Sequence, residues 1–226
     1  MGKRMKSYLA FTTFAYRLVL FLLTPFMVIG IQTLLSPLGD SGLALGLYLT
    51  ASLMVEVEII MDYWAFGAVA VKNNSCLEFL KTSAKGLNMM KTALWQNTFR
   101  MFAESLLLLL LGVTAHYLAR GEYAWLTKEM GAQEPAKLLT IVMAVYLLAV
   151  GGQLITRHFD SIHINVCAAI LANIVLHPLL MAVIDNAYFS NYYVLVVLTL
   201  LAVSISAIGF RRIMSRVEEG YYDERF

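Results

Sequence analysis

The sequence predicts an all-α, polytopic membrane protein with six transmembrane helices, and two observations support this prediction. Hydrophobic residues make up 60% of the 226 residues, charged residues make up only 14%, and the mean hydropathy is +0.71. A soluble domain needs about 25% charged residues to cover its surface. The apolar residues also form long blocks without the alternation of an amphipathic helix or strand, so the outside of the fold is expected to face the lipid bilayer.

Six apolar blocks follow one another along the chain, each close to the ~20 residues that cross about 30 Å of hydrocarbon. In chain order they cover residues 17–35, 43–60, 101–118, 138–155, 164–184 and 193–210. We expect them to form a single transmembrane domain over residues 1–226.

The basic residues indicate which ends of these helices are cytoplasmic. The side of the membrane that holds the N-terminus carries fourteen Lys and Arg residues, and the opposite side carries only three, namely Arg120, Lys128 and Lys137. Cytoplasmic loops are enriched in Lys and Arg, so both termini and the segment between the second and third blocks are predicted to be cytoplasmic. The chain is therefore expected to be a multi-pass protein of the cell membrane. A net charge of +2 is too small to suggest a nucleic-acid partner.

The long cytoplasmic segment, residues 64–100, is predicted to contain a short helix. Ser75 and Glu78 form a capping box, in which each side chain accepts a hydrogen bond from the backbone amide of the other residue. Lys81 and Lys85 lie near the C-terminal end of this helix, where they favour its dipole, and Gly86 suits the C′ position. The apolar side of the helix would be formed by Leu77, Leu80 and Phe79.

Two further helical segments are expected on the cytoplasmic side. A second helical stretch begins near Asn88 and runs toward the third span. Residues 1–16 are predicted to lie in the headgroup plane as a basic, aromatic-rich interfacial helix. The alternative is that residues 1–16 only set the topology and start the first span early.

The order of these elements, together with one sequence stretch, resembles a known family. The stretch Asp62-Tyr63-Trp64-Ala65-Phe66-Gly67, followed by Leu77-Glu78-Phe79-Leu80-Lys81-Thr82-Ser83, is similar to a motif of small permeases of peptide and bacteriocin export. Together with the interfacial helix, two spans, a cytoplasmic helix and four further spans, the chain looks like the membrane subunit of an ABC-2 type exporter. The topology resembles this family along the whole chain, whereas the motif covers only residues 56–100.

The resemblance implies partners and a role for the cytoplasmic helix. The chain lacks the phosphate-binding loop of an ATPase, so ATP and Mg²⁺ would bind to separate cytoplasmic ABC ATPase subunits, and this chain itself would hold no cofactor. A second permease, identical or related, would complete the transporter. The capped helix would couple the ATPase to the membrane through Ser75, Leu77, Glu78, Phe79, Leu80, Lys81, Lys85 and Gly86. The alternative is that residues 76–85 lie on the membrane surface and couple to nothing.

Ionisable and polar residues within the spans are candidates for the substrate path, because such residues are costly in a membrane. Glu104 is expected to form an ion pair with Arg100 at a spacing of four residues. Glu56 and Glu58 point about 200° apart on a helix, so they cannot serve one site. All three carboxylates could pair structurally or line an inward-facing path. Asn173 and His177 share one face of the fifth span, where interhelical hydrogen bonding competes with a substrate contact.

Signatures of other classes are missing from the sequence. It contains no G-x-S-x-G or H-E-x-x-H motif, and we predict neither catalytic residues nor a metal site. The sequence therefore predicts the permease of an ATP-driven exporter of a peptide or amphipathic toxin, and not an enzyme. An accessory membrane scaffold, sensor or toxin-immunity protein without transport activity remains the alternative, followed by a membrane enzyme with an unrecognised site.

Overall fold

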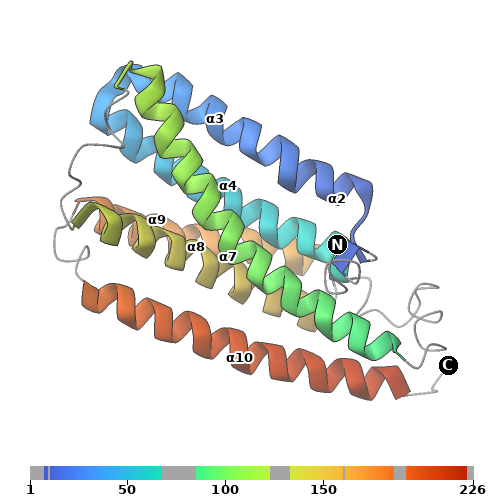
Figure 1. Cartoon of the computed structure of the whole chain (residues 1–226). Helices are drawn as coiled ribbons and strands as arrows, with labels where there is room; N and C mark the ends of the chain where they lie inside the picture. Colours follow the sequence, from blue (N-terminus) through green and yellow to red (C-terminus); the bar gives the residue numbers. More distant parts are fainter. Residues whose placement is uncertain are drawn as a thin grey trace.

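A computed structural model of the chain describes residues 8–9, 11–67, 85–122, 133–159, 161–185 and 192–222. These residues form a bundle of long helices, shown in Figure 1, and no strand occurs among them. In chain order the elements are α2 (Phe14–Leu18), η1 (Val19–Leu23), α3 (Thr24–Leu35), η2 (Ser36–Leu38), α4 (Gly39–Asp62), η3 (Tyr63–Gly67), α7 (Gly86–Ala119), α8 (Gln133–Phe159), α9 (Ile162–Asp185) and α10 (Tyr192–Tyr222). The all-α prediction is confirmed for this part of the chain.

Five helical stretches in the described residues are long and apolar enough to cross a membrane. The first, Phe14–Ala65, spans 52 residues and contains both the first and the second predicted block. The chain folds back within it, because Gly39 has a φ of 64° and α3 and α4 then contact each other. A positive φ is costly for residues with a side chain, so this turn explains a glycine at position 39. The other four stretches cover the remaining predicted blocks, apart from residues 182–184 of the fifth block, which lie in α9 beyond the stretch Ile162–Met181.

The helical limb from Phe14 to Leu35 changes its winding near Pro25. Pro25 has no backbone N–H, and its ring would collide with the carbonyl group four residues earlier in a regular α-helix. The turn before it, η1, is a π-helix, and the hydroxyl of Thr24 donates a hydrogen bond of 2.9 Å to the carbonyl oxygen of Val19. The wider turn lets the helix continue past the proline.

Helix α8 lies at the centre of the packing, in contact with α4, α7, α9 and α10. Its core face carries small residues such as Ala144 and Ala149, which lets neighbouring helices approach closely. One such close approach is at Gly152, where a Cβ atom would lie 2.3 Å from Cδ1 of Ile59 in α4. A larger residue at this position would push α8 away from α4.

Helix α10 lies along one edge of the bundle and α2 and α3 along the opposite edge (Figure 1). Within the most apolar window of each spanning stretch, between 17% and 50% of the residues are buried in the chain. The remaining apolar surface is exposed, which matches a protein whose outer surface faces lipid.

The region around residues 85–100 differs in part from expectation. The helical stretch expected from Asn88 and the third predicted span form one helix, α7, whose 34 residues are about 51 Å long. Gly86 is its first residue, and it is not among the glycines with positive φ, so the assignment of Gly86 as a C′ residue is wrong. Lys85 is the N-cap residue of α7. The predicted coupling residues Ser75, Leu77, Glu78, Phe79, Leu80 and Lys81 lie outside the described residues.

Candidate functional site

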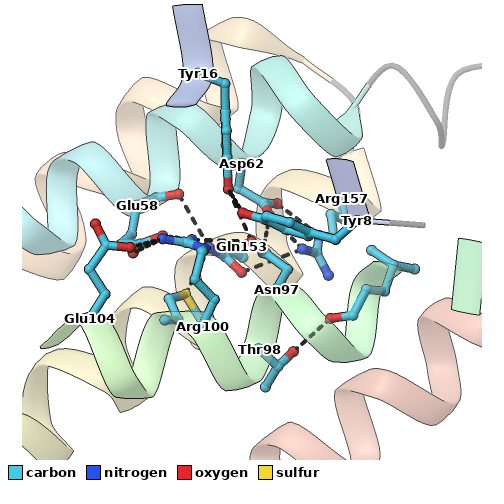
Figure 2. Close-up of polar contacts among 12 residues, drawn as sticks. Tyr8, Tyr16, Glu58, Asp62, Asn97, Thr98, Arg100, Glu104, Gln153 and Arg157 are labelled. Carbon is cyan, nitrogen blue, oxygen red and sulfur yellow. Dashed lines mark hydrogen bonds and ion pairs between the residues drawn. The ribbon is translucent and has the colours of Figure 1, made fainter. Parts of the chain in front are cut away.

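Charged and polar side chains from four segments meet inside the bundle, close to the end of α4 and the middle of α7 (Figure 2). We call this cluster the ionic network. It consists of Tyr8 and Tyr16 from the N-terminal segment, Glu58 and Asp62 of α4, Asn97, Arg100 and Glu104 of α7, and Gln153 and Arg157 of α8. All nine side chains are buried.

Arg100 joins two carboxylates in the first half of the network. Its Nη1 donates a hydrogen bond of 2.9 Å to Oε1 of Glu58, and its Nη2 donates one of 2.5 Å to Oε2. Nη1 also forms an ion pair with Glu104, so the predicted pair at a spacing of four residues is confirmed. The two parallel bonds to Glu58 are the bidentate geometry that a guanidinium group favours.

Asp62 and Arg157 form the second half of the network. Nε of Arg157 donates a hydrogen bond of 2.7 Å to Oδ2 of Asp62, and Nη2 pairs with Oδ1. Asp62 is only 1% exposed. The pair therefore ties the end of α4 to the end of α8.

Asn97 connects the two halves. Its Nδ2 donates to Oδ1 of Asp62 at 3.0 Å, while its Oδ1 accepts from Nη2 of Arg100 at 3.1 Å. The hydroxyl of Tyr16 donates to the same Oδ1 at 3.0 Å and lies 3.0 Å from the hydroxyl of Tyr8. Burial raises the pKa of Tyr8 to about 12, so this phenol remains protonated at neutral pH.

The network contains three carboxylates and two guanidinium groups in a largely buried setting. Removing one partner of a buried ion pair typically costs about 3–5 kcal/mol, because the other charge is left without compensation. The network therefore locks α4, α7 and α8 together. The ion pairs thus have a structural role, which is to hold these three helices in place. No group of three or more His, Cys, Asp or Glu side chains suited to a metal occurs in the part of the chain that the structure describes.

The structure separates the predicted substrate-path residues into two groups. Glu58 and Glu104 belong to the ionic network, which favours structural pairing for both. Glu56 is exposed on another face of α4 and accepts a hydrogen bond of 2.6 Å from Nδ2 of Asn173. Glu56 and Glu58 thus serve different sites, as their angular separation predicts. Asn173 joins α4 to α9, so the interhelical hydrogen bond expected for it is confirmed.

Sequence reasoning missed the pairing of Asp62 with Arg157 and the position of Asn97 between the two halves. Their spacing contained a signal. Glu58 and Asp62 lie four residues apart and share one face of α4, and Gln153 and Arg157 do the same on α8. Acidic residues on one face of an apolar helix favour pairing with a basic residue on another helix of the bundle.

A separate group of buried polar residues lies between α3, α4 and α7. Gln32 and His116 are completely buried, and among the described residues their side-chain nitrogen and oxygen atoms have no hydrogen-bond partner. The Gln32 side chain packs between two glycines. A Cβ atom at Gly46 would lie 2.4 Å from its Oε1, and a Cβ atom at Gly112 would lie 3.3 Å from its Cγ. Such groups reduce stability unless something outside this part of the chain satisfies them.

Comparisons of the chain with protein families, with curated proteins and with solved structures find no match.

Proposed function

We propose that this chain is the membrane-spanning permease of an ATP-driven exporter and that a separate cytoplasmic ATPase drives it. The observation that carries the proposal is the position of the ionic network. It connects the end of α4 with the middle of α7, and these two helices flank the segment 68–84 that contains the predicted coupling helix.

The network provides a mechanical reason for coupling through that segment. A displacement imposed on residues 68–84 reaches both α4 and α7, and the ion pairs prevent these helices from moving independently. The pair of Asp62 with Arg157 extends the same restraint to α8. Rigid-body movement of packed helices is a common way to transmit work from a soluble domain to a membrane domain.

The proposal includes six spans with both termini in the cytoplasm of the cell. The fold-back at Gly39 supports six, because the limb 14–35 and α4 contain 22 and 24 residues, or about 33 and 36 Å of helix. Each limb is then long enough to cross about 30 Å of hydrocarbon. The excess of Lys and Arg near the start of the chain, in the segment 68–84 and in the last third of α10 supports the orientation.

The complete exporter would pair this chain with a second permease, and the path would lie between the two. Binding and hydrolysis of ATP and Mg²⁺ would take place on the ATPase subunits. The cargo class, a peptide or amphipathic toxin, rests on the resemblance of residues 56–100 to permeases of peptide export.

Co-purification tests the proposal first. A tagged chain extracted in mild detergent from its native host should retain an ATPase subunit, detected by mass spectrometry and by ATP hydrolysis. A preparation without any associated ATPase, after crosslinking in the native membrane, would contradict the exporter assignment and favour the accessory or immunity role.

A double substitution tests the coupling segment. Leu77→Asp with Leu80→Asp should leave insertion and yield unchanged while ATPase retention and transport are lost. The matched control is Leu126→Asp in the predicted outer loop, which should alter neither. Unchanged ATPase retention and transport in the double variant would exclude this segment as the coupling element.

A further inference from the structure

Five polar or aromatic side chains line the contact between α4 and α9, on a different face of α4 from the ionic network. We call them the α4–α9 ladder: Tyr48, Ser52 and Glu56 at intervals of four residues on α4, and Asn173 and His177 on α9. The Ser52 hydroxyl donates a hydrogen bond of 2.7 Å to Oδ1 of Asn173. Nδ2 of Asn173 donates to Oε1 of Glu56 at 2.6 Å, and the His177 ring meets the Tyr48 ring edge-on with centroids 5.0 Å apart.

The ladder lies near the middle of the membrane-spanning part. Asn173 is eleven residues from Ile162 at one end of α9 and twelve from Asp185 at the other, or about 17 Å from each. The hydrocarbon core is about 30 Å thick. On α4, Glu56 lies six residues, or about 9 Å, before Asp62, so its carboxylate lies between the level of Asn173 and the end of the bundle that holds the ionic network.

The Glu56 side chain has no basic partner within the part of the chain that the structure describes. It is exposed on the surface of the chain. The amide of Asn173 orients one carboxylate oxygen and adds no positive charge. A charged side chain that faces lipid at mid-depth is costly, and such residues face protein or a water-filled cavity instead. The α4–α9 ladder is therefore poorly suited to face lipid.

We propose that the α4–α9 ladder binds the positively charged group of an amphipathic cation. The Glu56 carboxylate complements an ammonium, guanidinium or phosphonium group. Tyr48 lies eight residues, or about 12 Å, from Glu56 along α4, so it would contact the body of the ligand and not its charged group. Exposed Leu45 and Leu49 on α4 and Ile170 and Ile174 on α9 suit the apolar body of such a ligand. The identification of this ligand as exporter cargo rests on the proposed function, whereas the binding itself does not.

Binding of a simple lipophilic cation tests the inference. The full-length chain in nanodiscs of phosphatidylcholine is dialysed against tetraphenylphosphonium and, separately, against the uncharged triphenylphosphine oxide, with empty nanodiscs subtracted. The wild type should bind the cation saturably and with clear preference over the neutral compound. Glu56→Gln should weaken cation binding by about tenfold or more, because the ligand's cationic group then loses the carboxylate that it pairs with in an apolar site.

Three further variants distinguish the effect of the Glu56 charge on binding from effects of the substitution on local structure. Glu56→Asp keeps the carboxylate and should retain most of the binding. Asn173→Ala leaves the charge but frees the carboxylate from its hydrogen bond, and should weaken binding less than Glu56→Gln. The control Glu122→Gln removes a carboxylate that is paired with Arg120 at the end of α7, and should leave binding unchanged.

Equal affinity of the wild type and Glu56→Gln, no preference for the cation, or loss of binding in Glu56→Asp to the level of Glu56→Gln would each overturn the inference. The measurement uses the isolated chain and no ATPase. Failure to recruit an ATPase would therefore refute the proposed function and leave this result intact, and absence of cation binding would do the reverse.

Discussion

The buried pair of Asp62 and Arg157 gives the sharpest prediction about the ionic network. Replacing Arg157 by Met keeps most of the side-chain volume and removes the guanidinium group. The Asp62 carboxylate, 1% exposed, would then retain, among the described residues, the hydrogen bond from Asn97. A buried charge left in this way costs about 3–5 kcal/mol in the free energy of unfolding.

A double-mutant cycle isolates the contribution of the pair. Asp62→Asn alone removes the carboxylate of this pair and leaves Arg157 its other interactions, so it should cost less than Arg157→Met. The double variant buries two neutral groups, so it should be more stable than Arg157→Met alone, with a coupling energy of about 2–3 kcal/mol. The cycle is needed because Arg157 has further interactions that the single variant also removes.

Unfolding by SDS in mixed micelles, followed by the loss of helical circular dichroism, measures these free energies. The control is Arg120→Met, which breaks a pair with Asp40 at 3.4 Å whose two side chains are 29% and 96% exposed. Exposed pairs contribute below about 1 kcal/mol. The reasoning is refuted if Arg157→Met costs no more than this control, or if the effects of the two single substitutions simply add in the double variant.

Five other substitutions should have defined effects on stability in the same assay. Gly42→Ala should destabilise strongly, because its Cβ would lie 2.0 Å from a backbone carbonyl oxygen at the end of α3. The control Gly30→Ala adds a Cβ that meets nothing within 4 Å, so it should be neutral or stabilising. Equal effects of the two substitutions would contradict the close packing of α3 and α4. Gln32→Met and His116→Phe should each stabilise by about 1–3 kcal/mol, since they remove buried groups without partners, and a loss of stability would show that these groups are satisfied. Arg100→Lys should cost about 1.5–3 kcal/mol, because an ammonium cannot form the bidentate pair, and an unchanged midpoint would contradict that geometry.

The neighbouring carboxylates Glu56 and Glu58 have different roles, the first in the proposed cation site and the second in the ionic network. Glu58 is compensated by Arg100 and therefore supports structure, while Glu56, two residues earlier, is exposed without a cationic partner among the described residues. Glu58→Gln should accordingly lower stability in SDS, and Glu56→Gln should change cation binding with little effect on the unfolding midpoint.

Several features followed from the sequence because they depend on local properties of the chain. The length and apolar character of a block decide whether it forms a spanning helix, and each predicted block lies within a helical stretch of the structure. The ion pair of Arg100 with Glu104 and the divergent directions of Glu56 and Glu58 follow from 3.6 residues per turn. Local pattern was less informative at Gly86, because a glycine that suits the end of one helix suits the start of another equally well.

Only the tertiary structure decided which residues meet across the bundle. Glu58 pairs with Arg100 across 42 positions and Asp62 with Arg157 across 95, and no local pattern specifies those partners. Each pairing depends on how far a helix is rotated about its axis and how deeply it packs, and these are set jointly by small residues such as Gly152 against Ile59. The sequence alone therefore established a helical membrane protein with charged residues in its spans. Packing determined that one group of these charges holds the helices together, while Glu56 is left facing outward, because a rotation of about 200° on the same helix separates the two faces.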